Sequence, residues 1–266
     1  MGGFYRWPEL FVIKEMIPEL EWSREAALET VRFAAGLTYP DFEMNYEFVA
    51  ISKPDEYAIY DGEVLSSKKG RIPLERFERV YIETHVEHSN ALHSHGVDGK
   101  SYFVGPLARL NLNYAQLRPF ARQAAEEAGV QLPLRNPFKG LLARAIELVE
   151  VCAAAVELAH LYNPTGPSRL PITVKAGEGA GVSEAPRGLL YHRYIVDEHG
   201  MICYAKITPP TAQNFAQMEA DLWHFAPTVL DLPHEETTLA CEHLVRTYDP
   251  CISCATHFLS LKVESI

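Results

Sequence analysis

Two thiols and an imidazole lie close to the end of this 266-residue chain. Cys251, Cys254 and His257 follow one another at intervals of three residues, and Asp249 and Pro250 stand directly before them. Thiolates are soft ligands, so the pattern predicts a site for a thiophilic metal ion. A Cys-x-x-Cys pair alone is also compatible with a redox site or a zinc site.

The residues around the motif disfavour both alternatives. Redox sites of the thioredoxin type follow a strand and begin a helix, whereas helical periodicity over 235–246 leads into this motif. A zinc ribbon needs a second pair of ligands at short spacing, and Cys152, Cys203 and Cys241 are single and far apart. We interpret these three cysteines as small buried residues.

A second group of polar side chains lies near residue 90. Its members are His85, Glu87, His88, His93 and His95. Such density of histidines invites a metal interpretation. Polar histidines in loops are commoner than ligands, so a structural or interface role is the favoured interpretation.

Composition and charge exclude several classes of function. The formal net charge is −11 at pH 7 and there is no basic run, so a nucleic-acid partner is not expected. The longest apolar stretch, 140–162, contains charged residues at intervals and predicts an amphipathic helix, not a membrane span. No signal peptide is apparent, and five cysteines in a long chain argue against a disulfide framework. We expect a soluble, cytoplasmic protein.

The elements that must position these residues are helices and short strands. Ser23 and Gly36 are the expected start and stop signals of one helix. Helices are predicted at 22–35, 117–128, 140–162, 213–225 and 235–246, and strands at 46–51, 56–60, 80–83, 189–196 and 201–208, the last two as a hairpin. The segment 163–188 is rich in Pro, Gly and Ser and is a candidate active-site loop. The predicted fold is a helix-rich α+β domain over 1–266.

Three segments resemble one family, in the same order along the chain. The motif Asp-Pro-Cys-x-x-Cys-x-x-His at 249–257 resembles the C-terminal signature of the large (alpha) subunits of nickel-iron hydrogenases. Residues 184–192 resemble the arginine loop of that family, and 208–214 resemble the segment that wraps its iron.

The resemblance extends over most of the chain. It runs from residue 3 to residue 266, and the segments 88–94 and 105–111 are most similar to the soluble, cytoplasmic, NAD(P)-coupled branch. It implies the large-subunit fold, with a long central helix bundle, small peripheral sheets and a hairpin.

The resemblance also implies a metal centre and its reaction. Nickel would be joined to an iron that carries carbon monoxide and cyanide ligands, and H2 would be split heterolytically. Cys251 would be a terminal nickel ligand that also receives the proton, and Cys254 would bridge nickel and iron. With Cys251, Arg187 and Asp249 would form the catalytic set, Arg187 orienting the carboxylate.

Further residues take roles from the same resemblance. Arg187, Pro210 and Thr211 would supply hydrogen-bond donors to the cyanide ligands. His257 and the backbone carbonyl of Ile207 would hold a magnesium ion, for which a carboxylate ligand is missing.

One part of the family pattern has no counterpart here. The family also binds nickel through an Arg-x-Cys-Gly-x-Cys segment, which this chain lacks. The resemblance therefore implies a C-terminal portion of the large subunit, inactive as an isolated chain, from a mis-set start, a split gene or a partial gene. The alternatives are a non-catalytic hydrogenase-related subunit and an inactive gene fragment. Residues 258–266 resemble a removable C-terminal extension, so the chain would be a precursor.

Partners follow from what the chain would need. It has no motif for an iron–sulfur cluster, so electrons would pass to an iron–sulfur small subunit. Diaphorase-type subunits, nickel-insertion factors and a C-terminal endopeptidase are the other partners that the resemblance implies. The association with the small subunit is expected to be large and hydrophobic.

Overall fold

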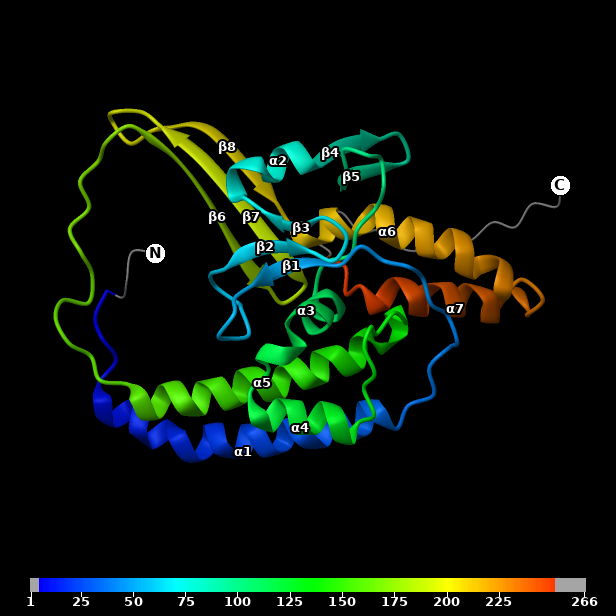
Figure 1. Ribbon diagram of the computed structural model, residues 1–266, viewed down its shortest axis with the longest axis horizontal. Coiled ribbons are helices and arrows are strands. Elements are labelled where there is room, and N and C mark those ends of the chain that lie inside the picture. Colours follow the sequence, from blue (N-terminus) through cyan, green and yellow to red (C-terminus); the bar gives the residue numbers. More distant parts are fainter. Residues whose placement is uncertain (1–4, 252–266) are drawn as a thin grey trace.

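The computed structural model describes residues 5–251. Its helices are α1 (Leu10–Ala35), α2 (Phe77–Val80), α3 (Pro106–Asn113), α4 (Pro119–Glu127), α5 (Gly140–Leu161), α6 (Pro210–Phe225) and α7 (His234–Thr247). Short 3-10 turns lie at Leu74–Arg76, Tyr114–Gln116, Pro137–Lys139 and Ala226–Thr228. α1, α4 and α5 lie on one side of the molecule and the small sheets on the other, with α6 and α7 beside the sheets (Figure 1).

The strands of the described residues form three antiparallel sheets. The first contains β1 (Val49–Ser52), β2 (Glu63–Ser66) and β3 (Gly70–Ile72), the second β4 (Tyr81–Val86) and β5 (Ser89–Gly96), and the third β6 (Gly177–Ala185), β7 (Gly188–Val196) and β8 (Ile202–Thr208). β6 pairs with β7 along its whole length, and the pair Ala185 and Gly188 closes their turn. This turn brings residues 186 and 187 to one end of the third sheet.

The helical layer is built on α5. α1, α4 and α5 run side by side, and α3 lies between them and the sheets (Figure 1). α1 buries Ala27, Val31 and Ala34, which follow one another on one face of the helix. α5 buries Ile146 and Val149 against them in the same core. Burying each large aliphatic side chain contributes about 1.5–3 kcal/mol.

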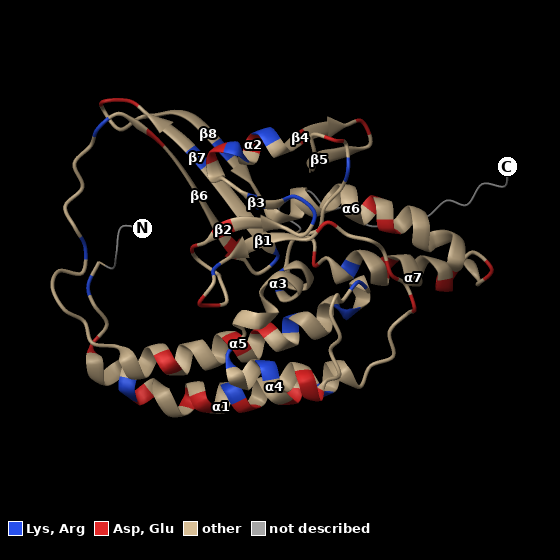
Figure 2. Cartoon of the chain, viewed as in Figure 1, with Lys and Arg blue, Asp and Glu red and all other residues tan. Residues whose placement is uncertain are grey.

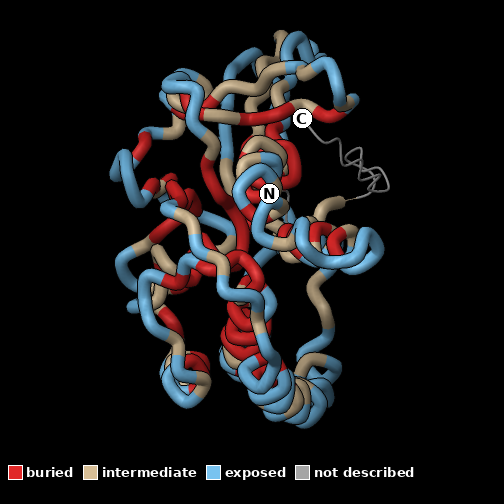
Figure 3. The backbone as a smooth tube through the Cα atoms, turned by 90° about the vertical axis from the view of Figure 1, so that its right-hand side faces the viewer, coloured by how far each residue is buried: buried red, intermediate tan, exposed pale blue. Residues whose placement is uncertain are grey.

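A second core lies between the sheets. Tyr102 and Tyr191 are fully buried there, and Phe77 stacks on Tyr191 with a centroid distance of 4.5 Å. Aromatic rings bury large apolar areas, so a few of them hold three short sheets together. Figure 3 shows the buried residues gathered along the middle of the molecule, with exposed residues at its periphery. The candidate site residues lie where the two cores meet.

The surface carries charges of both signs. Acidic and basic residues are both present along α1, with more acidic than basic ones (Figure 2). Apolar side chains are also exposed, among them Phe11 and Trp22 on α1 and Leu148, Val151, Leu158 and Leu161 on α5. None of the helices in residues 5–251 has the length and apolarity needed to cross a bilayer.

The predicted helices are confirmed, with one large change in length. The first begins at Leu10 and runs through Pro18 to Ala35, ending at Gly36 as predicted. The prediction of Ser23 as N-cap is wrong, because its hydroxyl donates to the carbonyl of Glu19 at 2.8 Å within the helix. Packing along α5 keeps α1 continuous through a proline that sequence rules treat as a helix breaker.

The predicted strands are confirmed in part. The hairpin is present as β7 and β8, and strands occur near 49–52 and 81–86. The strand predicted at 56–60 is wrong, because Tyr57 and Ala58 are buried in an irregular segment. The pair formed by β2 and β3, at 63–66 and 70–72, was not predicted.

Two segments that the sequence predicts as loops are strands. In 163–188, residues 177–185 form β6, so the long-loop prediction is wrong for that half. The histidine-rich segment forms β4, a turn and β5, in which Ala91 and His93 both face inward. β6 and β5 contain many residues with low strand propensity. Pairing with a neighbouring strand outweighs that low propensity.

Candidate metal centre

Cys251 lies beside the N-terminus of α6. Its backbone N–H donates to the hydroxyl of Thr211 at 3.4 Å, and Thr211 is buried. α6 begins at Pro210, whose missing N–H costs nothing at a first helical position. The segments 208–214 and 249–251, which the sequence predicts to act together, are therefore in contact.

Arg187 reaches the same place from the third sheet. It lies in the turn between β6 and β7, and its Nε is 3.1 Å from Asp249 Oδ2 and donates to the Asp249 carbonyl at 2.5 Å. Asp249 has a φ of 50°, a left-handed conformation that aims the chain toward α6. Four of the predicted site residues, Arg187, Thr211, Asp249 and Cys251, thus converge from three distant segments.

The turn that carries Arg187 rests directly on backbone. Gly188 has a φ of 139°, and a Cβ there would lie 2.6 Å from Val104 Cγ2 and 2.9 Å from Gly105 N. A Cβ on Gly105 would lie 2.7 Å from the Arg187 carbonyl oxygen. Only glycine permits this approach of the two segments.

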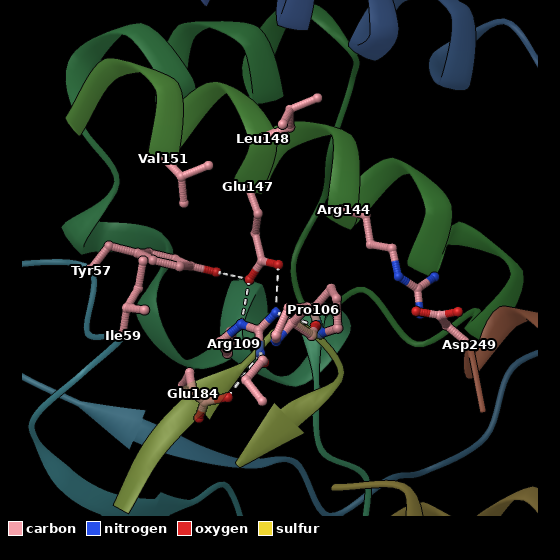
Figure 4. Close-up of a pocket in the computed structure, with 12 residues that line it drawn as sticks. Tyr57, Ile59, Pro106, Arg109, Arg144, Glu147, Leu148, Val151, Glu184 and Asp249 are labelled. Atoms are coloured by element: carbon pink, nitrogen blue, oxygen red, sulfur yellow. Dashed lines mark hydrogen bonds and ion pairs between the residues drawn. The ribbon is translucent and has the colours of Figure 1, made fainter. Parts of the chain in front are cut away.

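The buried guanidinium of Arg109 supports the turn between β6 and β7 (Figure 4). Arg109 on α3 donates to the carbonyls of Ala185 at 2.9 Å and Pro186 at 3.0 Å. It also pairs with two buried carboxylates, at 2.6 Å from Glu147 and 2.8 Å from Glu184. The residues just before Arg187 are therefore fixed by charge-assisted hydrogen bonds.

This network was not predicted from the sequence. Glu147 also accepts a hydrogen bond from Tyr57 at 2.6 Å, and Glu184 accepts one from the Ile51 amide at 2.9 Å. Burial raises the pKa of Glu184 to about 7, and the charge of Arg109 opposes that rise. Burial and the nearby Glu147 raise the pKa of Tyr57 well above its ordinary value. The sequence signal that could have indicated this network is Glu147, a charged residue in the apolar predicted helix 140–162.

A cavity of about 530 Å³ extends from this network to Asp249 (Figure 4). Its walls are Tyr57, Ile59, Pro106, Arg109, Arg144, Glu147, Leu148, Val151, Glu184, Ala185, Pro186 and Asp249. Arg144 and Asp249 face each other at one end, and the Arg109 network forms the other. The cavity joins apolar walls to a few charged groups, as binding sites usually do.

The chain is also anchored immediately before the motif. The hydroxyls of Tyr46 and Tyr248 donate to Asp221 Oδ2 at 2.7 and 2.5 Å, and Gln217 Nε2 donates to Asp221 Oδ1 at 2.8 Å. Burial raises the pKa of Asp221. Because Tyr248 precedes Asp249, α6 fixes the point at which the motif begins.

Two amides in the first turns of α6 hold the surrounding backbone. Asn214 accepts from the Val104 amide at 2.9 Å and donates to the Val104 carbonyl at 3.0 Å. Gln213 Nε2 donates to the carbonyls of Leu189 and Thr208 at 2.5 and 3.1 Å. The segment 208–214 therefore binds the strands beside Arg187 as well as Cys251.

The other predicted site residues have different outcomes. Pro210 is buried at the start of α6 but has no N–H, so it cannot be the predicted donor. Ile207 lies on β8 opposite His192. Cys254 and His257 lie outside the described residues, and so does the extension at 258–266.

The cysteines outside the motif are only partly as expected. Cys241 is buried, which confirms the prediction, and Cys152 is half-buried. Cys203 is exposed, so the prediction of a buried residue is wrong for it. Cys203 lies on β8, an edge strand of its sheet. Most residues of β8 are exposed.

The donors around Cys251 have a consistent chemistry. Cysteine sulfur is a soft ligand suited to nickel and iron. Arg187, the Thr211 hydroxyl and the first N–H groups of α6 are donors that favour anionic groups. The described residues therefore fit one wall of a soft-metal site that carries anionic ligands.

Comparison with known proteins identifies the family. Residues 57–257 match the family model described as nickel-dependent hydrogenase. The chain is 34% identical over 266 residues to sulfhydrogenase 1 subunit alpha of Pyrococcus furiosus, covering 98% of this chain and 61% of that protein. It is 37% identical over 174 residues to NAD-reducing hydrogenase HoxS subunit beta of Cupriavidus necator, covering 62% of this chain and 36% of that protein.

A solved structure shares the fold. The chain superposes with a TM-score of 0.75 and 24% identity on an NAD+-reducing [NiFe]-hydrogenase in the H2-reduced state, covering 96% of this chain and 62% of the other. This confirms the predicted large-subunit fold. The chain spans about three fifths of the length of the Pyrococcus furiosus subunit and of this solved chain. With the family model matched over most of its length, the chain belongs to the nickel-dependent hydrogenase family.

Proposed function

We propose that this chain is the C-terminal part of the catalytic large subunit of a nickel-iron hydrogenase, and that it takes part in the reversible heterolytic cleavage of H2. The observation that supports this most directly is the convergence of Arg187, Thr211 and Asp249 on Cys251. The proposal covers the chain as a single unit over 1–266.

Cys251 is the proposed terminal nickel ligand. The nickel–iron centre, when bound, supplies the chemistry that splits H2 into a hydride and a proton. The sulfur of Cys251 would take the proton, since a thiolate ligand is a base. Cys254 is the proposed bridging ligand. Asp249 forms an ion pair with Arg187 and stands two residues before Cys251 in the chain, so Arg187 would orient its carboxylate.

The start of α6 and Arg187 are the proposed binding site for the cyanide ligands. Cyanide nitrogens are anionic acceptors, and they need donors where water is excluded. The Thr211 hydroxyl, the amides of Thr211 and Ala212 and the guanidinium of Arg187 are such donors.

A magnesium site is a further part of the proposal. The carbonyl of Ile207 and His257 are its proposed ligands within this chain. Magnesium prefers oxygen ligands in an octahedral arrangement, so further oxygen ligands have to come from outside this chain or from water.

The apolar surface of α5 is the proposed contact with the rest of the assembly. Leu148 and Val151 line the cavity, and Leu158 and Leu161 are 64% and 69% exposed farther along the helix. Exposed apolar patches of this kind mark interaction surfaces. We propose that the missing part of the large subunit and an iron–sulfur small subunit cover it.

The cellular context follows from the relatives. NAD-reducing hydrogenases are among the proteins that this chain is similar to. We propose a cytoplasmic, NAD(P)-coupled complex with diaphorase-type subunits. Nickel-insertion factors would load the site, and an endopeptidase would then remove residues 258–266.

The test is the nickel and iron content of the chain, co-expressed with hydrogenase maturation factors. The chain is compared alone and together with a segment that carries an Arg-x-Cys-Gly-x-Cys pair. Both metals and H2-dependent dye reduction are expected only when both cysteine pairs are present, and Cys251→Ser should lose nickel. Cys203→Ser is the matched control, because Cys203 is exposed and far along the chain from the motif. Equal metal content in both variants would contradict the proposal and favour a non-catalytic relative.

A further inference from the structure

The histidine-rich hairpin packs against α6 (Figure 1). His88 in the turn between β4 and β5, His93 on β5 and Glu219 on α6 meet there. Nε2 of His88 lies 2.6 Å from Glu219 Oε1, and Nε2 of His93 lies 3.0 Å from the same oxygen. Within residues 5–251, this is the one group of at least three His, Cys, Asp or Glu side chains whose ligand atoms all lie within 4.8 Å of one another.

His93 is held rigidly. It is 3% exposed, and its ring stacks on Phe215 with a centroid distance of 5.2 Å and an interplanar angle of 24°. Phe215 and Glu219 are four residues apart on α6, so they lie on the same face of the helix. One helical turn therefore positions both the ring and the carboxylate.

The contact at Nδ1 of His93 leaves its Nε2 facing Glu219. Nδ1 lies 3.1 Å from the Ala91 carbonyl, and because a carbonyl only accepts, Nδ1 carries a proton. In the neutral ring Nε2 is then an acceptor that faces a carboxylate oxygen. That contact is favourable when a proton or a metal cation lies between the two atoms. A backbone carbonyl that fixes the far nitrogen is the usual second partner of a metal-binding histidine.

We propose that His88, His93 and Glu219 bind a divalent cation of the zinc class, with a remaining coordination position open to water. Two imidazoles and a carboxylate are ligands that zinc accepts. Zinc–ligand distances of about 2.0–2.1 Å place tetrahedral ligand atoms about 3.3 Å apart. The side chains of His88 and Glu219 are 64% and 46% exposed, so they have room to move apart by that small amount.

The proposed site is distinct from the cysteine motif. Glu219 lies eight residues beyond Thr211 on α6, about 12 Å along the helix axis. A bound ion would join the β4–β5 hairpin to α6, in addition to the ion pair between Lys206 and Glu83 that ties the hairpin to β8. The role assigned to the ion is to stabilise this contact.

The experiment measures zinc binding to the full chain by calorimetry and by metal content after dialysis. It uses a background with Cys251→Ser and Cys254→Ser, so that the thiols of the motif do not contribute. His88→Ala and Glu219→Gln each remove one exposed ligand and should leave the fold intact, which circular dichroism checks. His85→Ala is the matched control, since His85 is an exposed histidine on the same hairpin.

The expected result is one zinc ion per chain in the background and in the control. Changes in groups that only support a metal ligand lower affinity about 10–100-fold, so losing a ligand should lower it at least as much. Zinc should also raise the melting temperature of the background and the control, but not of the other two variants. No zinc bound by the background chain, or equal affinity in all four proteins, would overturn the proposal and leave a protonated histidine–glutamate pair.

Discussion

At the scale of single residues, a buried guanidinium supports the turn that carries Arg187. Arg109 uses its donors for two carboxylates and two carbonyls, and it is 5% exposed. Lysine has one nitrogen and cannot reproduce this planar arrangement. Breaking a buried ion pair by removing one partner costs about 3–5 kcal/mol, and a lysine that keeps the charge should cost somewhat less.

We therefore expect Arg109→Lys to lower the free energy of unfolding by about 2–3 kcal/mol, because Glu147 and Glu184 lose hydrogen bonds in a buried place. The measurement is urea denaturation of the chain. Arg32→Lys is the control, since Arg32 is 61% exposed in a surface pair with Glu29 and its replacement should change stability by no more than about 0.5 kcal/mol. Equal effects of the two substitutions would contradict the assigned role.

The carboxyl of Glu184 gives a prediction for pH dependence. Its pKa is raised from 4.5 to about 7 in the folded chain, so the folded state binds the proton more tightly than the unfolded state does. The contribution to stability is complete below pH 4.5 and is lost as the pH rises through about 7. The slope in that window is at most about 1.4 kcal/mol per pH unit.

Glu184→Gln should remove this slope, because an amide does not titrate. The measurement is the free energy of unfolding of both proteins at several pH values between 4.5 and 8. The difference between them should change across the window and level off above it. A difference that stays constant with pH would show that Glu184 is ionised throughout in the folded chain.

At the scale of elements, the tight turn between β6 and β7 sets the position of Arg187. A Cβ on Gly188 would press on Val104 and on the backbone of Gly105, so Gly188→Ala forces the two segments apart. We expect a loss of about 1–3 kcal/mol in stability and a weaker hold on Asp249. Gly181→Ala is the control, because Gly181 lies on the same hairpin with no atom near the added Cβ.

Urea denaturation of both variants tests this expectation. Gly181→Ala should be neutral or slightly stabilising, since alanine loses less entropy on folding than glycine does. If Gly188→Ala is as mild as Gly181→Ala, the close approach of the two segments does not constrain the turn.

Hydrophobic periodicity and turn residues predict those helices and strands that form without help from a distant segment. The long helices and the β7–β8 hairpin follow from periodicity and turn residues. β6 and β5 do not, because their glycines and histidines form strands only beside a partner strand. The length of α1 is likewise set by its packing on α5, which hides the effect of Pro18.

The sequence predicted only those site residues that lie within its recognised motifs. Arg187, Thr211 and Asp249 converge on Cys251 as expected, because the segments that carry them were recognised together. Arg109 and Glu147 were missed as members of the site. A charged residue on a helix has the same local pattern whether it faces water or a buried partner, and the distinction depends on contacts between distant segments.

At the scale of the whole molecule, an apolar surface runs from the cavity along α5. Leu148 and Val151 stand at the cavity, and Leu158 and Leu161 continue the surface. Stable interfaces bury about 1,200–2,000 Å² in total, with an apolar centre. A charged side chain placed at that centre would lose its water on binding and would have no oppositely charged partner, which weakens binding.

We therefore expect Leu158→Glu to weaken co-purification of the chain with the segment that carries the missing cysteine pair, at least tenfold in affinity. Leu158 is 64% exposed, so the substitution should leave the free energy of unfolding within about 0.5 kcal/mol. Leu239→Glu on α7 is the matched control, because Leu239 is also exposed and lies on a helix that does not line the cavity. Loss of association in both variants would mean a general effect of added charge, whereas loss in the first alone places the partner on α5.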